Sequence, residues 1–409
     1  MNLLGLRLFA AAPLLLVAAP STASTALPVR LGPTVMAHPM ASRSIGLGKV
    51  LTTADGGQIF GFDINQVGRD GVLATAQTVG PSDYLVSMET FDQDDGKISK
   101  VFAQYRGPRD SYTVHGIFAG DVGLITHFMN STNNSGAYRD YDVMNPVTAE
   151  NFTSKWTPPI KDLDVVMNAE NQTTSTSVLF AIELKNHDQP DLIVSSIAAN
   201  TFSNVIHLDG NLFAGDDSPQ LAQYAAANQA VIALSPDGGR VAGAAPINVG
   251  IDLKTDKQVR FTGYNNGPYG AGTVAGLAVD PNTGIAATTT VLNAQVEFYD
   301  LAKRTGIAAV QLPCSNDTAE LLSGTSVTVD SLNKLFLVTE QYYCGTNQGS
   351  AVVVYDERGT LIETITGFRL RDGNVAFAAN EPPVAISPRK RMGWAIIGPK
   401  FNQLQQFFY

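Results

Sequence analysis

The chain has 409 residues, of which 44% are hydrophobic and only 16% are charged. This composition can fill a large core, so it excludes a disordered chain, and the length suits two or three ordinary domains or one large repeat fold. The formal net charge of −10 argues against a nucleic-acid partner, because phosphate binding needs clustered Lys and Arg, and two cysteines exclude a disulfide-dense scaffold.

The first element in the chain is an apolar run from Leu8 to Ala19. It follows a single positive charge, Arg7, and precedes the small residues STASTA. This order is typical of a secretory signal peptide, and the run is shorter than the roughly 20 residues that a spanning helix needs. We predict a cleaved signal at residues 1–26, secretion, and one domain at residues 27–409. No later stretch is long and apolar enough for a transmembrane segment.

Export affects the interpretation of the cysteines and of the glycosylation sequons. In an oxidising compartment, Cys314 and Cys344 are expected to form a disulfide. Five sequons make the chain a candidate glycoprotein. Their asparagines are Asn130, Asn133, Asn151, Asn171 and Asn316.

The C-terminal half contains four related stretches, each with an apolar run, a Ser or Asp at a turn, and a second apolar run. The shared turn position is occupied by Ser235, Asp280, Asp330 and Ser387, at spacings of 45, 50 and 57 residues. Asp or Ser at the start of a tight turn accepts a hydrogen bond from the backbone that follows it. Tyr-Asp turns in VEFYDLAKRTG and VVVYDERGT indicate a second hairpin in each unit.

Each unit is therefore expected to form four short antiparallel strands, which predicts an all-β fold. We predict a single β-propeller with seven blades of four strands, with six or eight blades as alternatives. A pair of sandwiches would not repeat one turn at this spacing, and a β-helix would have shorter coils. Residues 219–227 are the only helix candidate after the signal, and residues 27–35 are predicted to supply the strand that completes the last blade.

The motifs SPDGG, VDPNTG and VDSLNK, together with the Tyr-Asp units, resemble the secreted propellers of the YVTN and lactonase-like group, and also quinoprotein-type repeats. The resemblance covers most of the mature chain in pattern, with its clearest motifs in the C-terminal half. It implies a propeller fold. It does not carry over an activity, because these motifs form turns in propellers of many functions. No metal ligand can be transferred from it residue by residue.

A four-stranded meander distributes its connections between two faces. The loops between second and third strands and the connections between blades share one face, called here the mouth face. The turns between first and second strands and between third and fourth strands share the other, the turn face, where Ser235, Asp280, Asp330 and Ser387 are expected. The longer segments are expected on the mouth face, where loops on a rigid scaffold usually bind ligands.

Polar residues just before the inner strands are expected to surround the mouth. The candidates for acid–base chemistry are His115, Asp110, Asp162, Asp164 and Glu381. The candidates for ligand binding are Tyr112, Gln229, Thr273, Thr325 and Asn380. A mouth lined with acids would suit general acid–base chemistry or a divalent cation such as calcium.

Two classes of function remain open at this point. One is a secreted enzyme that acts on a small molecule at the mouth by lactone hydrolysis, isomerisation or cyclisation. The other is a non-catalytic secreted module that binds a ligand, a glycan or a protein. The chain has no HExxH, GxSxG or CxxC motif, so zinc-protease, α/β-hydrolase and thioredoxin-type chemistry have no support. In either class we predict a monomer.

Overall fold

The computed structural model of the chain describes residues 46–53, 56–65, 69–80, 83–108, 112–119, 122–129, 142–144, 163–171, 176–183, 190–196, 201–209, 218–225, 229–235, 247–262, 274–290, 295–311, 323–344, 347–368, 384–397 and 400–409. The chain divides into two units, residues 1–33 and 34–409, and all described residues belong to the second. The predicted signal segment and the strand predicted at residues 27–35 lie outside the described residues.

The described residues form seven sheets, numbered here as blades in chain order. Blade 1 contains β2 (Gln58–Ile64), β3 (Asp70–Val79), β4 (Asp83–Asp92) and β5 (Ile98–Pro108). Blade 2 contains β6 (Tyr112–Ala119), β7 (Val122–Met129) and β8 (Asp142–Met144). Blade 3 contains β9 (Leu163–Asn171), β10 (Thr176–Glu183), β11 (Pro190–Ser196) and β12 (Thr201–His207). Blade 4 contains β13 (Ser218–Ala225), β14 (Gln229–Ser235), β15 (Ile247–Asp252) and β16 (Gln258–Thr262).

Blades 5 to 7 contain the remaining strands, and blade 7 also contains the first strand of the described chain. Blade 5 contains β17 (Val274–Val279), β18 (Ile285–Thr290), β19 (Gln295–Asp300) and β20 (Thr305–Gln311). Blade 6 contains β21 (Ser323–Asp330), β22 (Leu335–Cys344), β23 (Asn347–Asp356) and β24 (Leu361–Phe368). Blade 7 contains β25 (Val384–Ser387), the 3₁₀ turn η4 (Pro388–Lys390), β26 (Met392–Ile397), β27 (Gln403–Phe408) and β1 (Leu47–Thr52).

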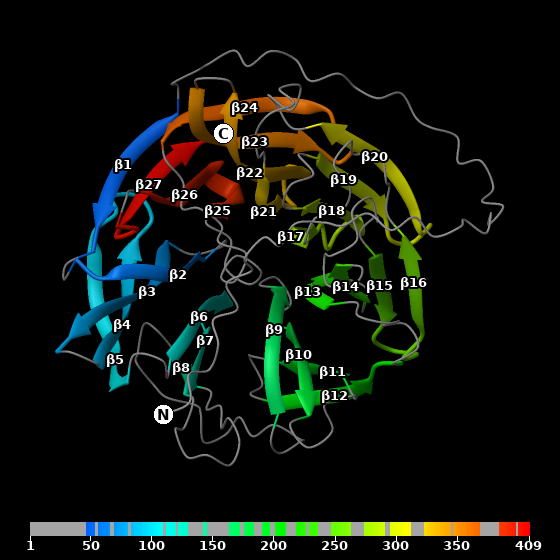
Figure 1. The fold of residues 1–409 in the computed structure, drawn as a ribbon, viewed down its shortest axis with the longest axis horizontal. Coiled ribbons are helices and arrows are strands. Elements are labelled where there is room, and N and C mark those ends of the chain that lie inside the picture. Colours follow the sequence, from blue (N-terminus) through cyan, green and yellow to red (C-terminus); the bar gives the residue numbers. More distant parts are fainter. Residues whose placement is uncertain are drawn as a thin grey trace, which may run out of the picture. The chain divides into compact units, whose positions relative to one another are not determined.

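The blades form a closed ring through their first strands. Each inner strand contacts the inner strand of the next blade, in the order β2, β6, β9, β13, β17, β21 and β25, and β25 contacts β2 again (Figure 1). Within each sheet the strands are antiparallel neighbours. The described residues therefore confirm the prediction of a seven-bladed propeller; six blades have four strands and blade 2 has three described strands.

The ring is completed by β1, which pairs with β27 as the outer strand of blade 7. A closing strand from the N-terminal part of the chain was predicted, but its position was wrong. Residues 47–52 occupy that place rather than residues 27–35. Leu51 is buried opposite Leu404 and contributes to the core between blades 7 and 1, whereas its neighbours in β1 are largely exposed.

The helix predicted at residues 219–227 is also wrong, because Ser218–Ala225 forms β13, the inner strand of blade 4. The segment is rich in Ala, Gln and Leu, which favour helices. Its contacts with the inner strands β9 and β17, together with its pairing to β14, place it in the ring as a strand. Tertiary context outweighs the local propensity here.

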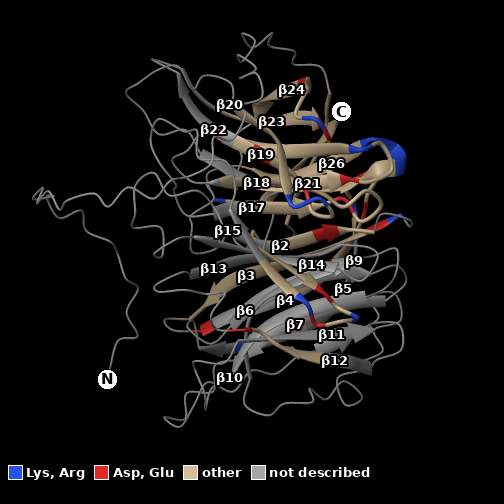
Figure 2. Cartoon of the chain, turned by 90° about the vertical axis from the view of Figure 1, so that its right-hand side faces the viewer, with Lys and Arg blue, Asp and Glu red and all other residues tan. Residues whose placement is uncertain are grey.

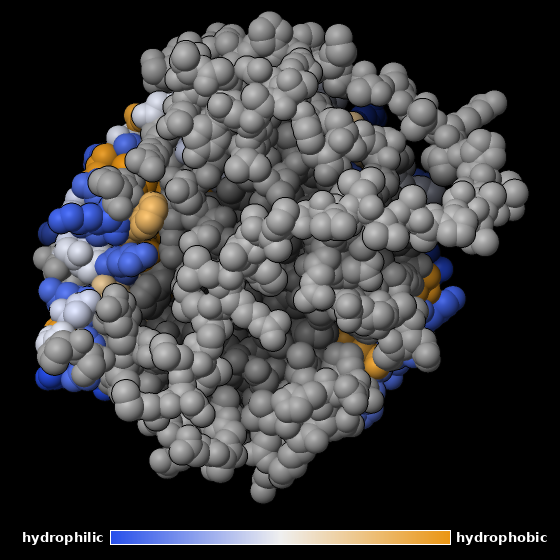
Figure 3. Space-filling view, viewed as in Figure 1, coloured by the Kyte–Doolittle hydropathy of each residue, from blue (hydrophilic) through white to orange (hydrophobic). Residues whose placement is uncertain are grey.

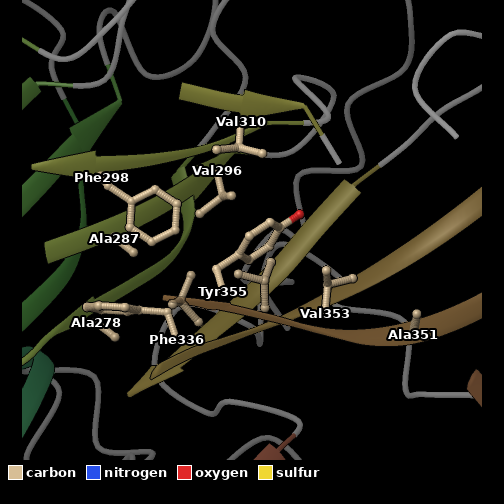
Figure 4. Close-up of a cluster of buried hydrophobic side chains, with 11 residues drawn as sticks. Ala278, Ala287, Val296, Phe298, Val310, Phe336, Ala351, Val353 and Tyr355 are labelled. Atoms are coloured by element: carbon tan, nitrogen blue, oxygen red, sulfur yellow. The ribbon is translucent and has the colours of Figure 1, made fainter. Parts of the chain in front are cut away.

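The core lies between blades, since both sides of each sheet pack against a neighbour. Between blades 5 and 6, Phe298 is in edge contact with Phe336 and with Tyr355, at centroid distances of 5.6 and 5.9 Å (Figure 4). Similar clusters fill the interfaces of blades 6 and 7 and of blades 7 and 1, where Trp394 is fully buried against Phe91. Some large apolar residues on outer strands are exposed, such as Val50 and Val101. The coloured part of the rim in Figure 3 is a mixture of hydrophilic and hydrophobic residues.

Candidate functional site

The mouth face is the face at which the seven inner strands begin. Tyr112 is the first residue of β6, and His115 lies further along the same strand, opposite Thr126 in β7. Asp164 is the second residue of β9, opposite Ile182. Because β6 and β9 contact each other, the backbone brings the His115 and Asp164 positions onto neighbouring inner strands.

Thr325 lies near the start of the inner strand β21, at a register shift between Gly324 and Ser326. This puts its backbone position at the mouth end of blade 6. Five other candidates for the mouth lie outside the described residues. They are Asp110, Asp162, Thr273, Asn380 and Glu381.

Gln229 does not belong to the mouth. It begins β14, the second strand of blade 4, and pairs with Ala225 at the end of the inner strand. Its position is therefore on the turn face. Ser235 was also assigned to the wrong strand. It ends β14 and is followed by the connection to β15 on the mouth face, so its assignment to the turn after an inner strand was wrong. Both errors follow from interpreting β14, rather than β13, as the inner strand.

The residues predicted for covalent modification are only partly described. Cys344 is the last residue of β22, at the mouth end of blade 6, and Asn171 ends β9 at the turn face. The remaining members of these sets lie outside the described residues; they are Cys314, Asn130, Asn133, Asn151 and Asn316. The disulfide and the use of the sequons stay predictions.

The two faces differ in the length of their connections. On the turn face, every connection between described strands has two to five residues. On the mouth face, six connections have ten to fifteen residues, for example residues 236–246 and 369–383. Long connections at one end of a rigid ring are where ligand contacts usually arise.

The short turns repeat one hydrogen-bonded design, in which an aspartate at the start binds the backbone that follows. Asp280 Oδ1 accepts the N–H of Asn282 at 2.8 Å, and Asp330 Oδ1 accepts the N–H of Asn333 at 2.9 Å. Both residues follow or end an inner strand, as predicted. Asp92 does the same in the sequence DQDDGK, which forms the turn between β4 and β5.

Neighbouring blades are joined on the turn face by side chains of these turns. Thr283 donates a 2.6 Å hydrogen bond to Glu357 Oε1, linking blades 5 and 6. Asp280 is fully buried beside this pair, and its Oδ2 accepts no hydrogen bond. Burial raises the pKa of the Asp280 carboxyl, the hydrogen bond from Asn282 opposes this, and the nearby Glu357 carboxylate raises it further, so that it lies above its ordinary value.

Buried carboxylates inside the sheets were missed by the sequence analysis. Glu340 on β22 is fully buried and lies on the same side of its strand as Phe336 and Val338, which face blade 5. Neither carboxylate oxygen has a hydrogen-bond partner. Burial raises the pKa of Glu340 to about 8, and its proximity in turn contributes to a raised pKa of Tyr355. Glu340 is therefore protonated at neutral pH.

Glu340 lies toward the mouth end of β22, where it pairs with Ala351. Thr289 of blade 5 faces the same interface, and its buried hydroxyl also lacks a partner. No motif in the sequence marks these residues, because alternating polar positions in a strand normally indicate a solvent-exposed side.

Within the described ranges, no group of three or more His, Cys, Asp or Glu residues is arranged to hold a metal ion. The divalent cation stays a prediction. The described part of the chain also contains no helix of the length and hydrophobicity needed to cross a bilayer.

Comparison with known proteins identifies the fold and no family. No family model matches the sequence, and no curated protein matches it. Among solved structures, the chain is similar to the WD40 repeats of RRP9, with 12% identity, a TM-score of 0.56, and coverage of 90% of this chain and 99% of that one. It is also similar to the β-propeller domain of Cps50 (Swd1) from Myceliophteria thermophila, with 11% identity, a TM-score of 0.56, and coverage of 89% of this chain and 99% of that one. These similarities, together with the sheet topology, establish that the chain is a β-propeller.

Proposed function

We propose that this chain is an exported binding module that takes a small polar molecule or a glycan at its mouth face. The observation that carries the proposal is the asymmetry of the connections. Six connections of ten to fifteen residues occur at the end of the ring where the inner strands begin, and the opposite end has only short turns between the described strands.

The chemistry at the start of the inner strands supports a polar ligand. Tyr112, His115 and Asp164 lie on two contacting inner strands, β6 and β9. Thr325 lies near the mouth end of another inner strand, β21. Phenol, imidazole, carboxylate and hydroxyl groups are the ones that bind sugar hydroxyls and small polar molecules through directional hydrogen bonds. Export is proposed from the signal-like segment at residues 1–26.

A binding assay with matched variants tests the mouth. The full exported chain is titrated calorimetrically against a panel of oligosaccharides and small lactones, and Asp164→Asn should weaken binding of any hit by at least 10-fold. Glu170→Gln, near the other end of the same strand, is the control and should bind as the wild type does. Equal affinity in the Asp164→Asn variant would contradict the proposal. Mass analysis of secreted protein should find an N-terminus near residue 24 or 27.

A second candidate function is acid–base catalysis at the same rim. It is favoured by one observation, the placement of His115 and Asp164 on neighbouring inner strands. Imidazole and carboxylate are two of the groups that most often serve as general acids and bases. Lactone turnover with a pH optimum that is lost in both His115→Gln and Asp164→Asn would select catalysis. Binding without turnover would select the binding module.

A further inference from the structure

The turn face carries exposed basic side chains on three consecutive blades, opposite the mouth. In blades 5 to 7 these are Lys303, Arg304, Lys334, Arg358, Arg389, Lys390 and Arg391. We call this set the basic arc. Figure 2 shows its last members as a broad blue loop next to β26. Among the described residues, only Lys303 and Lys390 of this set form ion pairs, with Asp300 at 2.7 Å and with Asp94 at 2.5 Å.

The acids of the same turns offset only part of the positive charge of the basic arc. Seven cations stand against five acids, which leaves an excess of +2 (7 − 5); the acids are Asp280, Asp300, Asp330, Asp356 and Glu357. Asp280 and Asp330 are fully buried. Asp330 Oδ2 accepts bonds from Asn333 and Tyr409, at 2.7 and 2.9 Å. Asp356 Oδ1 accepts two backbone N–H groups of its own turn, both at 2.8 Å. Burial removes Asp280 and Asp330 from the surface, so exposed cations outnumber exposed acids on the turns of these three blades.

Three members of the basic arc occupy backbone positions that favour glycine. Arg304, Lys334 and Arg391 have φ values of 56°, 57° and 46° and each closes its turn. The corresponding residue of the first turn in blade 5 is Gly284, with φ 70°. A side chain with a Cβ is strained in this left-handed region, and such strain is concentrated at functional sites. Long cationic side chains thus occupy three turn positions at which glycine would fit the backbone with less strain.

The turns that carry the basic arc are held side by side. Asn282 of blade 5 donates to the carbonyl oxygen of Ser331 in blade 6 at 3.3 Å. Asn333 of blade 6 donates to the carbonyl oxygen of Pro388 in blade 7 at 3.1 Å. Lys390 then reaches blade 1 through its ion pair with Asp94. The cations are consequently displayed on one fixed surface of short turns.

A large apolar side chain stands in the middle of this surface. Leu332 lies at the tip of the turn between β21 and β22 and is 63% exposed, the highest value among the exposed large hydrophobic residues of the described chain. It is two positions from Lys334, and its turn contacts that of residues 388–391. An exposed leucine on the same face as these cations suits a partner that is both anionic and apolar.

We propose that the turn face is a docking surface for a lipid bilayer that contains anionic phospholipid. Arg304, Lys334 and Arg391 contact phosphate groups, and Leu332 enters the boundary between headgroups and acyl chains. A sulfated or carboxylated glycan would use the cations and leave Leu332 without a role. The net charge of −10 does not prevent docking, because at physiological salt charges beyond about 8 Å are largely screened and the local arc decides.

Sedimentation of the full chain with vesicles tests this docking surface. Vesicles of 30% phosphatidylglycerol in phosphatidylcholine should bind the protein at 0.1 M NaCl, and pure phosphatidylcholine vesicles should not. The triple variant Arg304→Gly, Lys334→Gly and Arg391→Gly relieves the backbone strain and should keep its fold while binding falls by about 100-fold, at about 5-fold per cation and somewhat less for partial contact. Leu332→Ser should lower binding by about 10-fold at unchanged charge.

A matched control distinguishes the loss of positive charge from the release of backbone strain as the cause of weaker vesicle binding. Asp256→Gly changes a residue of the same kind, with φ 56° in a turn of blade 4, and removes no cation. It should bind vesicles at least as well as the wild type. A second triple variant with Asn at positions 304, 334 and 391 repeats the test, since Asn also tolerates left-handed backbone. Full binding by both triple variants overturns the proposal, and so does binding of heparin or polyglutamate without binding of the vesicles.

Discussion

The hydroxyl of Tyr409 donates a 2.9 Å hydrogen bond to Oδ2 of Asp330, so the residue after β27 is fastened to the first turn of the preceding blade. The ring of Tyr409 is buried, and Arg391 lies over it at 5.7 Å from the centroid. Burial and the Asp330 carboxylate raise the pKa of Tyr409, which keeps its proton at all physiological pH values. This contact joins blades 6 and 7 directly.

We predict that Tyr409→Phe lowers the free energy of unfolding by about 1–2 kcal/mol, because the buried Oδ2 of Asp330 loses one of its two donors. Urea denaturation measures the change. Phe408→Leu serves as the control, since the neighbouring Phe408 is 44% exposed, and it should change stability by less than about 0.5 kcal/mol. Equal effects of the two substitutions would show that the hydroxyl is not responsible.

The protonated Glu340 predicts a dependence of stability on pH. Its folded-state pKa of about 8 exceeds the ordinary value of 4.5, so the folded chain holds a proton that the unfolded chain releases. The contribution is fully present below pH 4.5 and is lost as the pH rises to 8. Glu340→Gln should flatten this slope and, at pH 8, raise the free energy of unfolding by several kcal/mol, because each tenfold change in proton affinity corresponds to about 1.4 kcal/mol.

Denaturation curves between pH 5 and 8.5 measure the slope. Glu363→Gln is the matched control, because Glu363 lies on β24 and is partly exposed. It should leave the slope of the wild type in place. An unchanged slope in the Glu340→Gln variant would mean that Glu340 is ionised in the folded protein.

Close packing of blades 5 and 6 predicts a strong effect at Gly276. A Cβ there would lie 2.7 Å from the backbone nitrogen of Val327 and 2.6 Å from Thr289 Oγ1. Gly276→Ala should therefore force the inner strands β17 and β21 apart and cost more than about 2 kcal/mol. Gly284→Ala meets no atom within 4 Å and changes only a left-handed backbone position, so it should cost about 1 kcal/mol. Thermal unfolding of both variants compares steric exclusion with backbone strain.

The strand topology is compatible with the predicted disulfide. Cys344 ends β22 at the mouth face, and Cys314 belongs to the connection between β20 and β21, which starts and ends at that face. We predict one cross-linked peptide in a non-reducing digest of exported protein, and a stabilisation of about 3–4 kcal/mol from closing a loop of this size. Alkylation of both thiols in the absence of reductant would disprove the bond.

The sequence predicted the fold where the turn chemistry was local. Asp280, Asp330 and Ser387 each mark the turn that follows an inner strand, because an aspartate or a serine there can bind the next backbone N–H groups, as both aspartates do. Seven blades could be inferred from that spacing and the number of strands. In blade 4 the same pattern occurred at Ser235 in the second strand, so the assignment moved by one strand and put Gln229 on the wrong face.

The rest depends on contacts that no short motif records. β1 is a weakly amphipathic strand, and its place beside β27 follows from the geometry of ring closure. Glu340 appears in the sequence as an ordinary alternating polar residue, but blades pack on both sides, so alternation does not separate buried from exposed positions. The candidate mouth residues could be proposed from the expected topology. The basic arc could not, because the turns that carry it are brought side by side only by contacts between blades.

The pairing of β1 with β27 gives the ring a single seam. Lys49 and Gln406 are hydrogen-bonded at 3.2 Å although 357 positions separate them in the chain. A chain that emerges from a ribosome or a translocon from its N-terminus therefore holds β1 without a partner until almost everything else has been delivered. Joining the two ends by a short linker and reopening the chain between two other blades would let every blade form from contiguous sequence. Such a permuted protein should fold faster, since its last step no longer waits for the longest loop to close.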